Sequence, residues 1–128
     1  MLVQAGVACA HFVIFGGPEE TEATVRQGLD NIAGLEHCVV MGFSGIRIYP
    51  DTLIYKRALK EGFLKQTDSL LKPVYYVSPK VDKTWMDNTI AQSWARRPDR
   101  VFPPSKGQRI VETLRSLGYK GLLWERLI

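Results

Sequence analysis

The sequence predicts an α/β fold, built either as a partial (half) TIM-type barrel or as an open, largely parallel sheet with covering helices. Short apolar runs alternate along the 128 residues with segments in which apolar side chains recur at helical spacing. One of these runs, residues 37–43, is nearly continuous, which is typical of a parallel strand buried on both faces. Three or four strand–helix units are too few for a closed eight-stranded barrel, which needs about 200 residues or more.

The amino-terminal part contains a strand, a glycine turn and a helix. Before them, the chain is expected to begin with the tail of a helix that ends at Gly6. Residues 7–15 form the first strand, which the Gly-Gly-Pro turn at residues 16–18 ends. Over residues 20–35 apolar side chains recur at helical spacing, and acidic residues suit the positive end of the helix dipole.

The middle of the chain repeats this order. A second strand over residues 37–43 leads through a bend into a short extended piece, residues 46–49, which Pro50 ends. An Asp-Thr pair then provides an N-cap for a helix over residues 53–61.

The remaining elements follow after a loop. A strand rich in Val and Tyr is predicted over residues 73–77, and a long helix over residues 82–97. After a short extended Val-Phe piece, Ser105 is expected to cap a last helix over residues 106–117. A final strand is predicted over residues 122–124.

Composition indicates one domain, residues 1–128, which we expect to be the C-terminal fragment of a longer protein. No apolar run reaches about 18 residues and no basic region precedes the first apolar run, so we expect a cytoplasmic protein without a membrane span. The net charge of +4 is mild, and we interpret one basic cluster as a solvated face. That cluster comprises Arg96, Arg97, Arg100, Lys106 and Arg109. Aromatic residues are not interleaved with it, which argues against nucleic acid as a partner.

The two cysteines, Cys9 and Cys38, lie in apolar, strand-like runs. Neither belongs to a CxxC or CxxxCxxC cluster, so we interpret both as reduced, buried thiols. His11 and His37 lie near them, but the strand alternation of these four residues does not predict a shared tetrahedral site. We therefore expect no metal site in this chain.

The junction between the first strand and the first helix is a candidate ligand site. In α/β proteins ligands bind outside the carboxyl ends of the strands. Gly16 and Gly17 permit close approach of a ligand to the backbone, and a turn with positive φ is the alternative reason for glycine there. Glu20 and Thr21 are expected to cap the helix that follows.

The segment Ile-Arg-Ile-Tyr supplies a second candidate. Strand alternation places Arg47 and Tyr49 on one face, which we expect to be the concave side of a strand next to the first one. Arg47 could hold a carboxylate of a ligand through a forked pair of hydrogen bonds. The alternative is an internal salt bridge, since burying an unpaired charge is costly. Tyr75 and Tyr76 are expected to belong to the core.

Three segments resemble the radical S-adenosylmethionine (SAM) enzymes. The segment FVIFGGPEET is similar to the strand-and-turn motif GxIxGxxGE of that family. Ile14, Gly16 and Glu20 match the motif, whereas Phe12 replaces its first glycine and Glu19 replaces its last.

The two later segments resemble further strands of the same barrel. GIRIYPDTLIY is similar to a strand and helix usually written RxxPGTxLY, with Asp51 where glycine is common. LKPVYYVSP resembles a strand in the branch that carries an N-terminal cobalamin-binding domain. The resemblance covers most of residues 7–80 and identifies the chain as similar to the C-terminal half of a radical SAM barrel.

The resemblance implies that the parent protein is an Fe–S oxidoreductase or a methyltransferase-like enzyme. In that family a 4Fe–4S cluster on a CxxxCxxC loop cleaves SAM, and this branch also binds cobalamin. This chain has no such loop, so we expect it to be inactive alone, without catalytic residues or cluster, and to supply part of the SAM and substrate wall. Ile14 would pack against adenine, core packing being its alternative. The implied cofactor-binding residues are Ile14, Gly16, Gly17 and Glu20, and the implied substrate-binding residues are Arg47 and Tyr49.

Two other functions fit the sequence. One is a stand-alone α/β domain that binds a nucleotide or phosphate at the glycine turn, although neither GxxxxGK[ST] nor a full GxGxxG is present. The other is an interaction domain. The radical SAM interpretation predicts a small-molecule or lipid-like substrate, and an open sheet of this kind also predicts self-association through exposed strand edges.

Overall fold

A three-stranded parallel sheet forms the centre of the molecule, in the strand order β1-β2-β5. The structure is a computed structural model that describes residues 5–121, 126 and 127. The strands are β1 (Cys9–Phe15), β2 (Cys38–Ser44) and β5 (Arg100–Val101). Within the described residues this sheet is open and no barrel closes, which confirms the predicted open, largely parallel α/β sheet.

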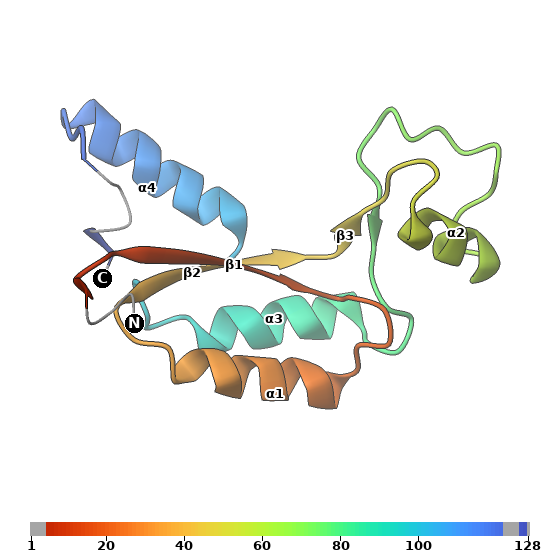
Figure 1. The fold of residues 1–128 in the computed structure, drawn as a ribbon, viewed down its shortest axis with the longest axis horizontal. Coiled ribbons are helices and arrows are strands. Elements are labelled where there is room, and N and C mark those ends of the chain that lie inside the picture. Colours follow the sequence, from red (N-terminus) through yellow and green to blue (C-terminus); the bar gives the residue numbers. More distant parts are fainter. Residues whose placement is uncertain (1–4, 122–125, 128) are drawn as a thin grey trace.

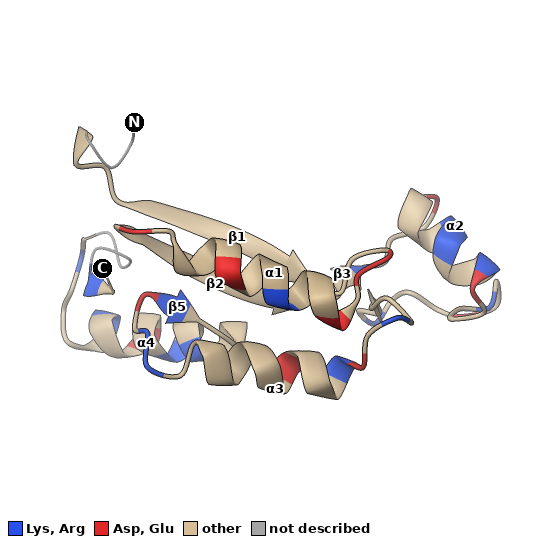
Figure 2. Ribbon diagram, turned by 90° about the horizontal axis from the view of Figure 1, so that it is seen from below, with Lys and Arg blue, Asp and Glu red and all other residues tan. Residues whose placement is uncertain are grey.

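Helices lie on both sides of the sheet. The helices α1 (Glu22–Ala33) and α3 (Lys83–Ser93) run side by side across one face, as Figure 2 shows. On the other face, α4 (Pro104–Ser116) contacts β2 and β5 (Figure 1). The uncovered part of that face carries the exposed side chains of Phe12 and Ile14.

A smaller unit extends from one end of the sheet (Figure 1). It consists of an antiparallel pair, β3 (Ile46–Arg47) and β4 (Tyr75–Tyr76), and of the helix α2 (Leu53–Lys60). Sequence analysis expected residues 46–49 beside the first strand and residues 73–77 in a parallel sheet. Both expectations are wrong, because these short strands pair with each other.

Gly45 explains why the chain leaves the main sheet at this point. Its φ is +82°, and its N–H donates to the carbonyl of Phe15 at 2.7 Å. A Cβ built on Gly45 would lie 3.0 Å from the carbonyl oxygen of Tyr76. The residue is therefore both a left-handed turn and a point of close backbone contact between the two sheets, where glycine is strongly favoured.

Two apolar clusters stabilise these units. The larger one lies between the parallel sheet and α1 and α3, and the smaller one lies under α2. Fully buried side chains at their centres are Val25, Val40, Met86 and Ile90 in the first, and Ala58 and Tyr76 in the second. The periodic apolar residues of the sequence thus fill the helix–sheet core, as their spacing predicts.

Side chains cap three of the helices, and the sequence predicts two of these caps, Thr21 and Thr52. Thr21 accepts from the Thr24 N–H at 3.3 Å, and Thr52 and Asp82 cap α2 and α3 in the same way. The cap expected at Ser105 is wrong: α4 begins at Pro104, and no side chain caps it. Proline suits the first helical position because it has no N–H to satisfy.

The expected solvated basic cluster is also wrong in part. Arg100 is buried, and its guanidinium donates to the carbonyls of Ile32, Leu35 and Cys38. Asp99 pairs with Arg100 at 2.7 Å and with Arg97 at 2.7 Å. These contacts tie the end of α1 to β5 and make this part of the cluster structural.

Three further expectations concern the two ends of the chain and the absence of a membrane span. The final strand over residues 122–124 lies outside the described residues, as does most of the expected helix tail before Gly6. None of the helices in the described part of the chain combines the length and the apolar composition that crossing a bilayer requires.

Candidate functional site

A cavity of about 570 Å³ lies at the carboxyl ends of the parallel strands. Each of the three strands, or the residue directly after it, contributes to the wall, through Ile14, Phe43, Ser44 and Phe102. This is the edge of the sheet where α/β proteins bind ligands. Aromatic and aliphatic side chains line the cavity together with several polar ones.

Several of the polar lining residues belong to α3. Ser44 donates its hydroxyl to Asp87 Oδ1 at 2.5 Å, and the ammonium group of Lys83 pairs with Asp87 Oδ2. Asn88 follows Asp87 and also lines the cavity. Both carboxylate oxygens of Asp87 are engaged, so this group joins β2 to α3.

Arg47 also lines this cavity and belongs to the β3–β4 unit. Its guanidinium carbon lies 4.8 Å from the centroid of the Tyr49 ring, so the two predicted substrate-binding residues are in contact. Within the described residues no carboxylate pairs with Arg47, and the internal salt bridge considered from the sequence does not form. A guanidinium beside an apolar wall can bind the anionic group of a ligand with an apolar body.

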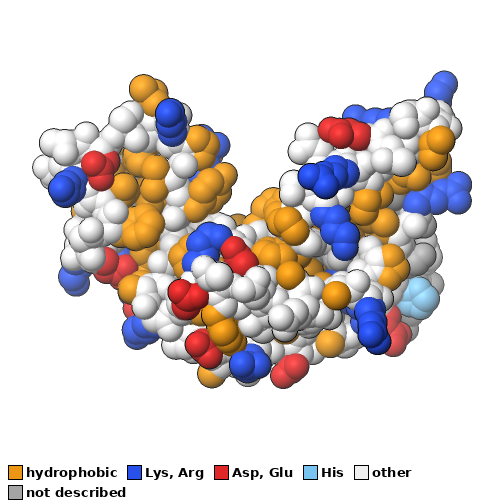
Figure 3. Space-filling view, turned by 180° about the vertical axis from the view of Figure 1, so that it is seen from behind, with side chains coloured by type: hydrophobic (Ala, Val, Ile, Leu, Met, Phe, Trp, Pro, Cys, Tyr) orange, Lys and Arg blue, Asp and Glu red, His pale blue; other side chains and the backbone are white. Residues whose placement is uncertain are grey.

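Ile14 belongs to the uncovered face of the sheet. It is 55% exposed, so the alternative role of core packing does not apply to it. Phe12 is 65% exposed on the same face, and its ring lies 6.1 Å from that of Phe43. Figure 3 shows hydrophobic side chains gathered in the hollow between the end that carries α2 and the end that carries α4.

The backbone N–H groups of the glycine turn after β1 form hydrogen bonds within the protein. The N–H of Gly17 donates to Glu20 Oε2 at 3.0 Å, and the N–H of Gly16 donates to the same oxygen. Glu20 therefore binds the turn rather than capping α1, which is a correction, whereas Thr21 does cap α1. Gly16 has φ +87°, as a turn with positive φ requires.

Ser78 fixes this turn from the other side. Its hydroxyl donates to the carbonyl of Glu20 at 2.8 Å, and its N–H donates to the carbonyl of Gly16 at 2.9 Å. Gly16, Gly17 and Glu20 do not line the cavity at the strand ends. The structure thus brings together Ile14 and Arg47 there, with Tyr49 against Arg47, and leaves the three turn residues beside them.

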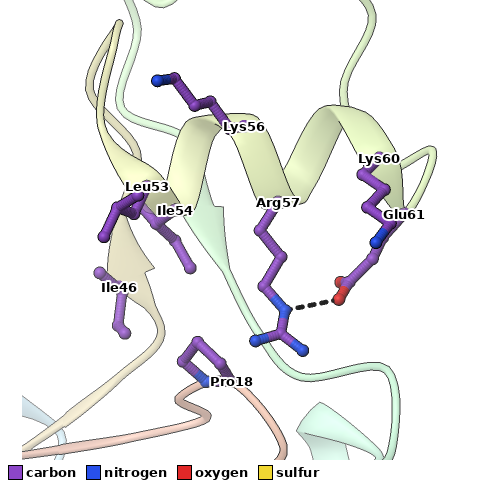
Figure 4. Close-up of a pocket in the computed structure, with 8 residues that line it drawn as sticks. All are labelled: Pro18, Ile46, Leu53, Ile54, Lys56, Arg57, Lys60 and Glu61. Atoms are coloured by element: carbon purple, nitrogen blue, oxygen red, sulfur yellow. Dashed lines mark hydrogen bonds and ion pairs between the residues drawn. The ribbon is translucent and has the colours of Figure 1, made fainter.

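A second cavity, of about 720 Å³, lies between the glycine turn and α2 (Figure 4). Pro18 and Ile46 form one side of it, and Arg57 extends toward Pro18 from α2. Arg57 pairs with Glu61 at 2.7 Å and also with Glu19, so its charge is neutralised within the protein. Figure 4 shows Lys56 directed away from the cavity.

Glu61 belongs to an internal network rather than to a ligand site. The hydrogen bond from Arg57, and then that from Tyr76, holds the pKa of the Glu61 carboxyl below its usual value. Burial is the main cause that raises the pKa of Tyr76, whose hydroxyl donates to Glu61 at 2.8 Å. These contacts join α2 to β4 and engage both carboxylate oxygens of Glu61 within the protein.

The sequence analysis did not find several residues of the cavity at the strand ends. Lys83 and Asp87 have the i,i+4 spacing of a helical ion pair, which was a usable signal, but nothing local connects them to Ser44. Tyr75, expected in the core, is 49% exposed and lines this cavity, whereas Tyr76 is buried as expected.

Among the residues that the structure describes, no three His, Cys, Asp or Glu side chains come together as a metal site would require. Comparison of the chain with protein-family models, with curated proteins and with solved structures finds no match.

Proposed function

We propose that this chain is the C-terminal portion of a radical SAM enzyme of the Fe–S oxidoreductase or methyltransferase-like kind. In that role it supplies part of the SAM and substrate wall. The observation that carries the proposal is the cavity at the carboxyl ends of β1, β2 and β5, which is lined by exposed Ile14 and by Arg47, whose guanidinium pairs with no carboxylate of the described residues.

The uncovered sheet face is the second support. In a barrel, apolar side chains on one face of each strand point inward and helices cover the other face. β1 has this arrangement, with Phe15 buried toward the helices and Phe12 and Ile14 exposed on the opposite side. We propose a half barrel for the parent protein. α4 departs from that pattern, because it lies on the face that a barrel turns inward.

The chemistry of the cavity suits SAM and an apolar substrate with an anionic group. Ile14 and Phe43 offer an apolar surface for adenine, and Asn88 offers an amide. Arg47 offers the donors that a carboxylate prefers, and SAM carries a carboxylate on its methionine part. A cavity of about 570 Å³ falls in the range of small-molecule sites.

The iron–sulfur cluster does not fit this chain. Such clusters are held by several cysteine thiolates, and the chain has two cysteines, neither of which lines the cavity. In the proposal the 4Fe–4S cluster and the cobalamin belong to other parts of the parent protein. No chemical step is therefore assigned to this chain beyond binding and orientation.

The alternative of a phosphate site at the glycine turn has less support. Glu20 already receives the N–H groups of Gly16 and Gly17, so an external phosphate would have to displace an internal carboxylate. Arg47, by contrast, has donors with no carboxylate partner in the described residues.

Saturation-transfer NMR on the purified chain with SAM tests the proposal. We expect transfer to the adenine protons and a Kd on the order of millimolar, because the chain supplies only part of the wall. Ile14→Asp should abolish the transfer, whereas Leu117→Asp, at another exposed apolar site, should leave it unchanged. Arg47→Gln should weaken SAM binding about 5-fold or more and leave adenosine binding unchanged, since adenosine has no carboxylate.

The matched control for Arg47 is Arg26, which also lies over an aromatic ring, at 5.0 Å from the centroid of Trp85. Arg26→Gln should bind SAM as the wild type does. Absence of transfer at millimolar SAM, or transfer that survives Ile14→Asp, would overturn the proposal.

A further inference from the structure

The two cysteines of the chain are direct neighbours in the sheet. Cys9 of β1 and Cys38 of β2 are partners in the parallel register, each the first residue of its strand. Neighbouring strands lie about 4.8 Å apart. Disulfides bridge Cα atoms that are about 4.4–6.8 Å apart, so the register places this pair at a bridgeable separation.

Both side chains project to the same side of the sheet. Cys38 is buried in the core under α1 and α3, and Cys9 packs against that same cluster from the edge strand. Side chains of residues that are opposite each other in a parallel pair leave the sheet in the same direction. The two sulfur atoms therefore share one face, and both are free thiols in this structure.

The two thiols differ in access to solvent. Cys9 is half-buried, and its Sγ makes a weak contact with the carbonyl of Val7 at 3.4 Å. Cys38 is 2% exposed. A reagent in solution can thus reach Cys9 first, while Cys38 is positioned to react next.

We propose that Cys9 and Cys38 form an oxidisable pair that closes an intramolecular disulfide across β1 and β2, with a small-molecule disulfide as the oxidant. The site is independent of the proposed function, since neither cysteine lines the cavity at the strand ends.

The reaction proceeds by two thiol–disulfide exchanges. The Cys9 thiolate attacks one sulfur of the small disulfide, forms a mixed disulfide and releases one small thiol. The Cys38 thiolate then attacks the Cys9 sulfur, forms the Cys9–Cys38 bond and releases the second small thiol. Two protein thiols are oxidised, one small disulfide is reduced to two thiols, and the two protons pass to the released thiolates.

The bridge joins the amino ends of β1 and β2 and encloses α1 in a covalent loop. Cross-linking restricts the unfolded chain more than the folded one, so the oxidised form should unfold at a higher temperature. For a chain of this size and a loop of this length an increase of about 10 °C is expected.

The test treats the reduced full-length chain with glutathione disulfide under native conditions and follows the intact mass. We expect the wild type to lose the mass of two hydrogen atoms without retaining glutathione, and to yield one cross-linked peptide that contains Cys9 and Cys38. A wild type that keeps both thiols, accumulates glutathione adducts or forms only intermolecular dimers would overturn the proposal.

Two variants separate the steps. Cys38→Ala should stop at one glutathione adduct on Cys9, and Cys9→Ser should remain unmodified because Cys38 is buried. An unmodified Cys9 in folded Cys38→Ala would contradict the order of attack. Should Cys38→Ala fail to fold by circular dichroism, the peptide map and the melting temperature of the wild type still decide the proposal. A cross-link that leaves the melting temperature unchanged or lowers it would contradict the stabilising role.

Discussion

Glu20 accepts a hydrogen bond from the backbone N–H of Gly17 at 3.0 Å, so the turn that ends β1 contains its own anion. The N–H of Gly16 donates to the same carboxylate oxygen. A glycine turn before a helix is commonly interpreted as a place for an external acceptor. Here the acceptor is an internal side chain, and the cavity that is open to a ligand lies next to the turn, at Ile14 and Arg47.

Glu20→Ala should destabilise the protein by about 1–3 kcal/mol, because the N–H groups of Gly16 and Gly17 lose their acceptor. The free energy of unfolding is measured by urea denaturation. Glu22→Ala, at an exposed position in the first turn of α1, is the control and should change stability by about 0.5 kcal/mol or less. Equal effects of the two substitutions would show that the Glu20 contacts do not stabilise the turn.

Gly42→Ala should destabilise the fold by about 1–3 kcal/mol, because an added Cβ meets rigid aromatic rings. It would lie 2.8 Å from Trp94 Cζ3 and 3.2 Å from Phe102 Cδ2. Gly34→Ala is the matched control, since its nearest contact would be 3.8 Å and its φ of −78° suits alanine. Thermal unfolding followed by circular dichroism compares them, and a lower melting temperature for the Gly34 variant than for the Gly42 variant would contradict the packing described at β2.

Arg100→Lys should destabilise the protein by about 2–4 kcal/mol, whereas Arg47→Lys should change stability by about 0.5 kcal/mol or less. The guanidinium of Arg100 is buried and donates to four backbone carbonyls, and lysine cannot reproduce that fork. Arg47 is exposed and contacts the Tyr49 ring. Chemical denaturation of both variants checks the contrast, and a large loss for Arg47→Lys would assign it a structural role instead.

Stability should fall in acid partly because of Asp99. The hydrogen bond from Arg97 is the main cause that lowers the pKa of the Asp99 carboxyl, and the charges of Arg100 and Arg97 lower it further. The folded state therefore binds fewer protons than the unfolded state near the ordinary aspartate pKa of about 3.9. Asp99 therefore contributes to the stability of the fold above the ordinary aspartate pKa. This contribution is lost as the pH falls through the lower pKa that Asp99 has in the folded protein.

Asp99→Asn should accordingly weaken the dependence of the unfolding free energy on pH below about pH 4, and should also lower stability at neutral pH. Urea denaturation at a series of pH values measures both effects. Asp30→Asn is the control, because Asp30 is exposed on α1 and forms none of the ion pairs of the described residues. An unchanged pH profile for Asp99→Asn would remove Asp99 from the acid response.

Local sequence patterns were enough to predict where most of the helices lie. Thr21 and Thr52 cap α1 and α2 as their residue types predict, and the apolar spacing of α1 buries Val25 and Leu29. Capping bonds and helical periodicity involve residues that are close along the chain. Two expected caps fail: Glu20 binds the glycine turn instead, and α4 begins at Pro104 rather than after a cap at Ser105, because proline suits the first helical position.

The candidate site was less accessible from the sequence, because its parts meet only in three dimensions. Arg47 was found as a candidate from strand alternation, but its strand pairs with Tyr75 and Tyr76 and not with β1. Ser44 meets Asp87 across the space between β2 and α3. No short pattern in the chain predicts such a contact, since it depends on how a helix is placed on a sheet.

The sequence by itself determined the alternation of strands and helices, the apolar faces, the caps of α1 and α2 and the open, largely parallel character of the sheet. Tertiary structure alone decided the separate β3–β4 pair, the engagement of Glu20 with its own turn and the alignment of Cys9 with Cys38. The physical reason is the range of the interactions. Periodicity and caps act over one or two turns of chain, whereas strand register and side-chain pairing are set by packing between segments that are distant in sequence.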